Sequence, residues 1–443
     1  MMRCSRSLVL SVVLSVGCGS VKTGHLPDAP PGDPGVDAAV RGTVHVTVLD
    51  PAGTGAPAVG ANVVFIDPDG TLVKKAATDS AGKADADVLP GASVTSIALD
   101  GLQYQLETVL AVVPGDDVIL GIKSPDSSSA GDFTVTYPPA AGATSYNIVH
   151  PCGQISFPTP PTGGPPVPAK LTIANSCRMN TMELVVIPFN NAGPITSIAK
   201  DGIAFMPGGS TTISGMYQGL RSFTGSYTNI DPIITELSPS RAIPDEFGFS
   251  NGETFSAPKS TVVMQLTGPQ ATGGRMITRA DTAAGQSQTV RQTIAGTGGT
   301  YGLDVGATLL PWLDTPTYDP ASRKLVVTTN TTGTSAATPD MYQMVAVYQR
   351  LNNKGVATNF AWTISGPGPG DVVLPVLPAE LAELAPTTDD SVTVTSATMF
   401  EADSVASYDA IRNDVNSALA LYTGERPPGT TVRISRAATK RPR

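Results

Sequence analysis

Residues 42–50 read GTVHVTVLD, and valines alternate there with more polar residues. A period of two places every second side chain on the same face, which is typical of a strand with one buried face. The runs 60–70, GANVVFIDPDG, and 94–101, VTSIALDG, continue this strand-like pattern. Asp79-Ser80-Ala81-Gly82 separates two such runs, and Asp at the first and Gly at the fourth position favour a type I turn. This stretch therefore predicts short strands joined by tight turns.

The composition extends the same prediction to the whole chain. Its 443 residues are 15% charged, against about 25% in typical soluble domains, and they include 45 Gly and 39 Pro. β-Branched residues favour pleated sheets, whereas Gly and Pro interrupt them at turns. Long helical patterns are nearly absent from the sequence. The expected fold class is all-β, with tandem β-sandwich modules.

Residues 41–123 resemble the carboxypeptidase regulatory-like (transthyretin-like) β-sandwich family. The sequence departs from that family after Gly82, where Lys83 and Ala84 stand in place of the usual aromatic residue. The resemblance implies a spacer or binding platform without catalytic activity. It is carried by Asp50, Gly53, Pro57, Gly60-Ala61-x-Val63, Thr78-Asp79-x-x-Gly82 and Leu89-Pro90-Gly91.

Four further segments are expected after this module. Residues 124–215 resemble a fibronectin type III-like sandwich with Tyr137 and Tyr146 in its core, and residues 216–307 form another β-rich module. The spacing of strand-like runs in residues 308–422 again resembles a fibronectin type III-like module. One short helix is expected within residues 404–421. The basic segment 423–443 is expected to be a solvated tail.

The amino terminus resembles a bacterial lipoprotein signal peptide over residues 1–18. Arg3 and Arg6 precede an apolar run that is too short to span a bilayer, and small residues lead to Cys18. The family prefers Leu three positions before the cysteine, where this chain has Ser15. The resemblance implies that Cys18 is lipidated and becomes the mature amino terminus. An ordinary secretory signal that is cleaved nearby, so that Cys18 is discarded, is the alternative.

Residues 19–40 are rich in Gly, Pro and Asp and lack an apolar period, so they are expected to form a flexible tether. By the same resemblance, Gly19 after the cysteine implies delivery to the outer membrane of a diderm bacterium. The expected location is therefore the outer membrane or cell surface, with a lipid anchor. No apolar stretch in the rest of the sequence approaches the ~20 residues that a membrane-spanning helix needs.

Two cysteines, Cys152 and Cys177, remain beyond the signal region. In an oxidising compartment, such a pair is most simply a disulfide. It would close a proline-rich loop of about 25 residues and stabilise its module by roughly 3.5 kcal/mol on the chain-entropy model.

The sequence contains no recognisable catalytic or metal-binding motif. Its three histidines are not spaced as metal ligands, and neither HExxH nor GxSxG is present. No cofactor or metal is therefore expected, and the net charge of −9 argues against nucleic-acid binding. Trp312 and Trp362 are expected to be core residues, the alternative being that they stack on sugar rings.

These features favour a structural or adhesive surface lipoprotein that is not an enzyme. Its expected partners are the membrane, through the anchor, and a polysaccharide or a surface protein. An accessory carbohydrate-binding protein is the first alternative, which exposed coplanar aromatic side chains would favour. A secreted hydrolase is the second, which would require two carboxylates about 5–10 Å apart in a cleft.

Overall fold

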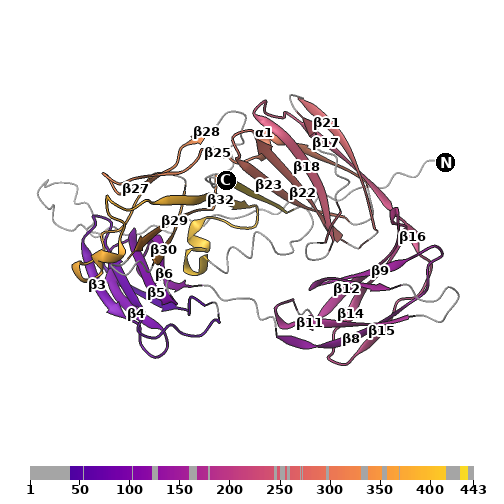
Figure 1. Ribbon diagram of the computed structural model, residues 1–443, viewed down its shortest axis with the longest axis horizontal. Helices are drawn as coiled ribbons and strands as arrows, with labels where there is room; N and C mark the ends of the chain where they lie inside the picture. Colours follow the sequence, from indigo (N-terminus) through magenta and orange to yellow (C-terminus); the bar gives the residue numbers. More distant parts are fainter. Residues whose placement is uncertain are drawn as a thin grey trace, which may run out of the picture. The chain divides into compact units, whose positions relative to one another are not determined.

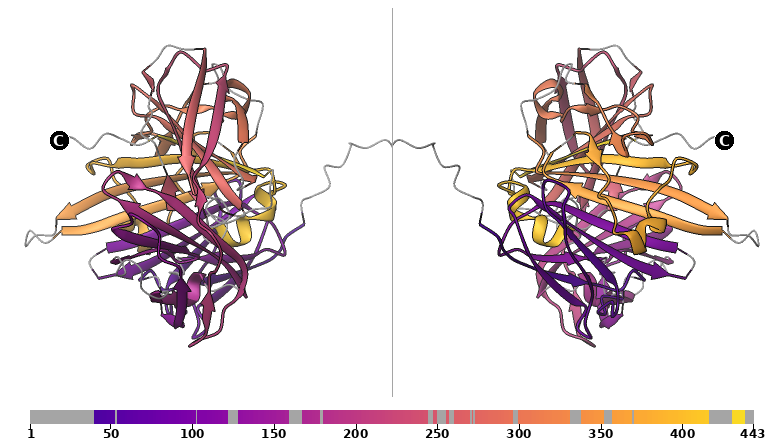
Figure 2. Two further views of the ribbon diagram at one scale, coloured as in Figure 1. Left: turned by 90° about the vertical axis from the view of Figure 1, so that its right-hand side faces the viewer. Right: turned by 90° about the vertical axis from the view of Figure 1, so that its left-hand side faces the viewer.

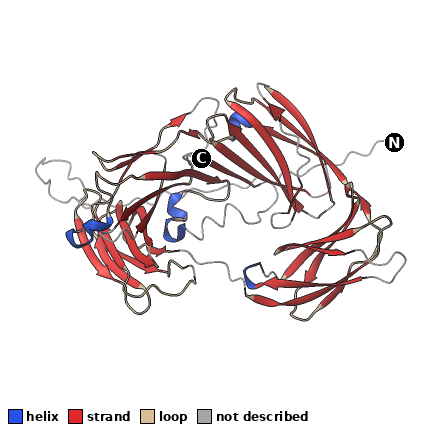
Figure 3. Cartoon of the chain, in the orientation of Figure 1, coloured by secondary structure: helices blue, strands red, loops and turns tan. Residues whose placement is uncertain are grey.

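The computed structural model describes residues 40–437, apart from residues 53, 102, 122–127, 159–166, 178–179, 244–246, 250–254, 257–259, 270, 272, 296–298, 331–337, 352–356, 369 and 416–429. The signal peptide, Cys18 and nearly all of the expected tether lie outside these residues. Strands make up most of the described chain, and its helices are short (Figure 3). The all-β fold class predicted from the sequence is confirmed.

The amino-terminal strands form two facing sheets with a shared apolar core. The alternating run at the start of the sequence forms β1, and its valines Val44, Val46 and Val48 are buried as predicted. One sheet has the order β4-β1-β7, and the other contains β3-β2-β5-β6. The strands are β1 (Gly42–Val48), β2 (Asn62–Ile66), β3 (Leu72–Ala77), β4 (Lys83–Val88), β5 (Ala92–Asp100), β6 (Gln103–Val112) and β7 (Asp117–Leu120).

The next strands form a second pair of sheets around Tyr137 and Tyr146. Both rings are fully buried with their centroids 5.1 Å apart, which confirms them as core residues. One sheet has the order β10-β9-β12-β14-β16, and the other has the order β11-β8-β15. The elements are β8 (Ser129–Tyr137), β9 (Ser145–His150), β10 (Gly153–Pro158), β11 (Val167–Ala174), η1 (Asn175–Cys177), β12 (Thr181–Asn190), β13 (Gly193–Pro194), β14 (Thr196–Ala204), β15 (Ser210–Thr212) and β16 (Gln218–Gly219).

The third group of strands contributes to two sheets. Three strands form a small sheet in the order β21-β17-β24, and the others join a larger sheet. The elements are β17 (Arg221–Thr228), β18 (Ile234–Ile243), β19 (Phe247–Phe249), β20 (Phe255–Ser256), β21 (Thr261–Gly268), β22 (Gly273–Thr282), β23 (Ser287–Ala295), β24 (Gly299–Asp304) and α1 (Val305–Thr308).

The carboxyl-terminal group supplies the long strands at the middle of the larger sheet. Trp312 and Trp362 are both fully buried, so the core prediction is confirmed and the sugar-stacking alternative is wrong. The elements are β25 (Trp312–Leu313), β26 (Thr317–Asp319), β27 (Lys324–Val326), β28 (Thr329–Asn330), β29 (Met341–Leu351), β30 (Ala357–Gly366), β31 (Val372–Val373), η2 (Ala379–Leu384), β32 (Thr393–Ala402), η3 (Tyr408–Ala410), η4 (Arg412–Asp414) and β33 (Thr431–Ala437).

A continuous 13-stranded sheet connects segments that are far apart in the sequence. Its main order is β19-β18-β22-β23-β33-β32-β29-β30-β6-β5-β2-β3, with β20 paired to β18. The junction is the parallel pairing of β6 with β30, in which Leu106 lies opposite Trp362 (Figures 1 and 2). The amino-terminal sandwich therefore shares its second sheet with the carboxyl-terminal strands.

The shared sheet is buried on both of its faces at β2. Val63 and Phe65 belong to one apolar cluster together with Phe400 and Tyr408, which come from the carboxyl-terminal segment. Their neighbours Val64 and Ile66 point to the opposite face, where they join a second cluster that includes Trp362 and Leu384. The sheet therefore lies between two apolar layers, and both layers draw on distant parts of the chain.

Polar contacts inside the sheet fix the junction. The Trp362 Nε1–H donates to Thr108 Oγ1 at 2.9 Å, and Thr108 Oγ1 lies 2.8 Å from Thr95 Oγ1. All three side chains are buried. Since an unsatisfied buried donor costs about 1–3 kcal/mol, this chain of contacts favours the observed register of β30, β6 and β5.

A buried ion pair makes a second long-range connection. Arg412 of η4 contacts the Asp116 carboxylate through Nε at 2.6 Å and Nη2 at 3.0 Å, and both side chains are less than a tenth exposed. Asp116 also accepts a hydrogen bond from the Val113 backbone N–H at 2.8 Å. The pair therefore ties the loop before β7 to the carboxyl-terminal segment.

One expectation for the carboxyl terminus needs correction. Residues 431–437 of the expected solvated tail form β33, which lies between β23 and β32 in the large sheet. The expected helix at 404–421 is described only in part: the structure has the short 3-10 turns η3 and η4 followed by the helical residue Val415, and residues 416–421 lie outside the described part. Tyr408, Ile411 and Val415 are nevertheless buried in the core, as their spacing suggested.

The Asp116–Arg412 pair gives a test of the long-range connection. Arg412→Met would leave the Asp116 carboxylate buried without its cation, so we expect the free energy of unfolding to fall by about 3 kcal/mol. Urea unfolding followed by tryptophan fluorescence measures the change. Lys170→Met, which removes the exposed Lys170–Asp132 pair, is the control and should change the value by less than about 1 kcal/mol. Equal losses in the two variants would contradict this role of the buried pair.

Candidate functional site

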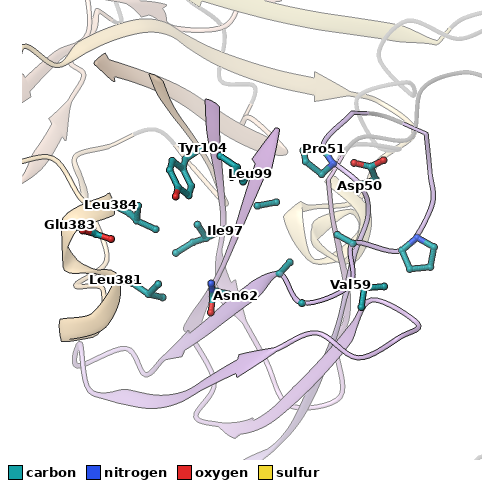
Figure 4. A pocket seen from close by; sticks show the side chains of 15 residues that line it. Asp50, Pro51, Val59, Asn62, Ile97, Leu99, Tyr104, Leu381, Glu383 and Leu384 are labelled. Carbon is teal, nitrogen blue, oxygen red and sulfur yellow. The ribbon is translucent and has the colours of Figure 1, made fainter. Parts of the chain in front are cut away.

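A pocket of about 560 Å³ lies beside the end of the β5–β6 hairpin. Three segments form its walls: the loop that connects β1 to β2, the facing ends of β5 and β6, and η2 from the distant carboxyl-terminal region (Figure 4). Its lining residues are Asp50, Pro51, Pro57, Ala58, Val59, Gly60, Ala61, Asn62, Ile97, Ala98, Leu99, Tyr104, Leu381, Glu383 and Leu384. Volumes of about 300–1,000 Å³ are usual for small-molecule sites.

The floor of the pocket is apolar. Ile97, Leu381 and Leu384 are buried side chains that belong to the same hydrophobic cluster, and Figure 4 shows them grouped on one side of the pocket. Val59 and Leu99, by contrast, are 66% and 56% exposed. The pocket therefore has a fixed apolar base beneath a rim of solvent-exposed aliphatic side chains.

An aromatic stack across three strands positions Tyr104. The Tyr104 and Phe360 ring centroids are 5.4 Å apart with an interplanar angle of 9°, and Phe360 stacks on Tyr348 at 4.7 Å and 2°. Phe360 and Tyr348 are buried, so only Tyr104 at the end of the stack reaches the pocket. The exposed coplanar aromatics that would favour a carbohydrate-binding platform are therefore not formed by this stack.

Arg350 holds the η2 wall against the stack. Its guanidinium carbon lies 5.2 Å from the Phe360 ring centroid, and Nη2 donates to the Ala385 carbonyl at 2.6 Å. It also forms an ion pair with Asp390, and this charge-assisted hydrogen bond lowers the pKa of the Asp390 carboxyl. The pocket wall is therefore fixed by contacts that do not depend on a ligand.

Two carboxylates lie at the pocket. Asp50 is held by its own loop, since its Oδ1 accepts from the Ala52 N–H at 3.1 Å and its Oδ2 from the Thr54 hydroxyl at 2.9 Å. Glu383 is an exposed residue of η2. The remaining polar side chains of the lining are Asn62 and Tyr104.

Of the residues that carry the family resemblance, Asp50, Pro57, Gly60 and Ala61 line this pocket, whereas the predicted disulfide residue Cys152 does not. Cys18 is outside the described residues, and the expected partner of Cys152 is Cys177, whose side chain is also not described. Cys152 itself is disulfide-bonded, and its Sγ lies 3.2 Å from the Ala174 backbone N. Sequence reasoning missed the pocket because no local pattern connects the β5–β6 hairpin with η2, nearly 300 residues later.

His150 has a structural environment rather than that of an exposed base. It is 2% exposed, and its Nδ1 accepts from the Cys152 backbone N–H at 3.2 Å. Burial lowers the pKa of the imidazole to about 4. The neutral ring is therefore part of the folded structure at neutral pH.

The described residues contain no group of three His, Cys, Asp or Glu side chains that could hold a metal ion. Within the same part of the chain, no helix has the length and apolarity needed to cross a membrane.

Comparisons with known proteins identify no family. No protein-family model matches the chain, and no curated protein matches it. Matching solved structures include the Bacillus anthracis TIE protein, at 10% identity and a TM-score of 0.15 over 60% of this chain and 51% of that chain, so this chain spans about half of that protein's length.

Two further matches are to other bacterial proteins. The Streptococcal ancillary pilin has 9% identity and a TM-score of 0.17, over 60% of this chain and 98% of that chain. Two B repeat units of the collagen binding protein of Staphylococcus aureus have 13% identity and a TM-score of 0.12. This match covers 80% of this chain and 92% of that chain. These scores are too low to establish a shared arrangement, so no function is transferred from these proteins.

The buried His150 predicts a loss of stability in mild acid. Its pKa is about 4 when folded and about 6.5 when unfolded, so the unfolded chain binds more protons between these values. The free energy of unfolding should therefore decrease as the pH falls from about 6.5 to 4, with a contribution from His150 of about 3 kcal/mol. Urea unfolding at a series of pH values measures this dependence.

His150→Asn keeps an acceptor for the Cys152 N–H but removes the titrating ring, so its stability should fall less steeply over this range. His45→Asn, at an exposed position on β1, is the control and should keep the slope of the unmodified protein. Parallel curves for His150→Asn and the unmodified protein would contradict the assignment.

Proposed function

We propose that this protein is an exported, lipid-anchored component of the cell envelope with a structural or adhesive role and no catalytic activity. The observation that carries the proposal is the order of three segments: an apolar run that ends at Cys18, a polar tether over residues 19–40, and a β framework that begins at Gly42. Each segment has a distinct physical role in such a protein.

The tether sets the reach of the folded part. A flexible chain of about 22 residues has a root-mean-square end-to-end distance of roughly 26 Å. This distance exceeds the thickness of a lipid headgroup layer, which is roughly 5–8 Å on each side of a bilayer. A folded part attached through Cys18 would therefore be held clear of the membrane surface, where its loops could meet a partner.

The framework supports a mechanical rather than a chemical role. Strand pairing links all 13 strands of the large sheet, and the ion pair of Asp116 with Arg412 connects distant segments. These buried charges are paired with one another, and the His150 ring accepts from the backbone. The buried Asp116–Arg412 pair and the buried His150 ring thus make their contacts within the fold.

The anchor can be tested by the state of the mature amino terminus. In the native host, we expect mass spectrometry to find acylated Cys18 as the first residue and detergent phase partitioning to place the protein in the detergent phase. Cys18→Ala should move it to the aqueous phase. Cys4→Ala lies before the apolar run, so it is the matched control and should behave like the unmodified protein. An unmodified terminus downstream of Cys18 would refute the anchor.

We also propose that the disulfide of Cys152 is made with Cys177, which would close the proline-rich loop. The exported protein should then contain no free thiol, and Cys177→Ser should release one, as measured by thiol titration under denaturing conditions. The variant should also lose roughly 3.5 kcal/mol of unfolding free energy. Ser176→Ala, at the exposed neighbouring position, should change neither value. Free thiols in the unmodified protein would rule out the pairing.

A further inference from the structure

The charge of the β5–β6 pocket restricts what it can bind. Its two charged lining residues, Asp50 and Glu383, are both acidic, and none of the lining residues is Lys, Arg or His. An anionic ligand would therefore meet two like charges without a compensating cation. A cationic group, by contrast, would be attracted to either carboxylate.

The carboxylates can accept further hydrogen bonds. A carboxylate has about four lone-pair sites, and the two contacts of Asp50 with Ala52 and Thr54 use one on each oxygen. These contacts also hold Asp50 in place without neutralising it. Glu383 is exposed on η2, so its carboxylate can turn toward a bound cation at the pocket.

The rest of the lining is suited to an apolar body. Ile97, Leu381 and Leu384 provide buried aliphatic surface, and the ring of Tyr104 points into the same space (Figure 4). An aromatic face also attracts organic cations, with an energy of about 0.5–1 kcal/mol at exposed sites. The volume of about 560 Å³ matches a small molecule rather than a bare ion.

We propose that this pocket binds a small amphipathic organic cation, whose ammonium group pairs with Glu383 on the η2 wall and whose apolar body lies on the neighbouring Ile97, Leu381 and Leu384. The proposal goes beyond the envelope role and is independent of the lipid anchor, since every lining residue belongs to the β framework and η2. The wall that carries Glu383 is already fixed by Arg350, so little ordering of the protein opposes binding.

Isothermal titration calorimetry with three probes of one shape tests the charge preference. The probes are 4-phenylbutylammonium, 4-phenylbutanol and 4-phenylbutyrate, and the protein is the full chain exported with Cys18→Ser, which needs no detergent. We expect the ammonium probe to bind most tightly and the carboxylate probe most weakly. Equal affinities for the three probes, or no binding of the ammonium probe, would overturn the proposal.

Variants of Glu383 locate the binding. Glu383→Gln should lower the affinity for the ammonium probe by about twofold to fivefold, as expected for an exposed charge pair. The affinity for 4-phenylbutanol should be unchanged. Glu383→Lys should reduce the preference for ammonium over carboxylate further. Both changes are at an exposed side chain, so the fold should tolerate them.

Glu380→Gln is the matched control. Glu380 lies on the same 3-10 turn but contacts Lys75 at 3.0 Å and does not line the pocket. It should leave the affinities of all three probes unchanged. An ammonium affinity that is unchanged in both Glu383 variants, or that falls equally in Glu380→Gln, would show that the cation does not bind in this pocket. Either result would leave the test of the lipid anchor unaffected.

Discussion

The parallel pairing of β6 with β30 is the constraint on which the rest of the structure depends. It brings residues 103–109 beside residues 359–365 and so makes one sheet from strands at opposite ends of the described chain. Contacts so distant in sequence carry a large loop-closure entropy. The buried Trp362–Thr108 hydrogen bond and the apolar layers on both faces of the sheet offset that cost.

This pairing also explains why the amino-terminal sandwich is not closed on itself. Its core contains Phe400, Tyr408 and Ile411 from the carboxyl-terminal segment, and Asp116 finds its cation in Arg412. A sandwich cut off after residue 123 would expose this apolar surface and leave a buried carboxylate unpaired. Local sequence patterns define the strands of such a unit, but they do not reveal which other strands complete its core.

The sequence predicted the features that depend on neighbouring residues. Alternation identified β1, and size and context identified Tyr137, Tyr146, Trp312 and Trp362 as core residues. It failed at β33, where the arginines in TVRISRA suggested a solvated tail. Arg433 lies directly opposite Glu401 in the pairing with β32 and also contacts Asp403 at 2.8 Å. The basic side chain is thus accommodated by a cross-strand partner that only the fold supplies.

The pocket is a further consequence of the same junction. Tyr104 lies at the start of β6 and stacks on Phe360 of β30, while Arg350 of β29 holds η2 in place above the hairpin end. Both walls are therefore positioned by the strands that join the two ends of the chain. Because a ligand that contacts both walls binds only the joined state, its binding must also stabilise the junction by mass action. Ligand binding and long-range stability are coupled in this fold for that reason, whatever anchors the chain.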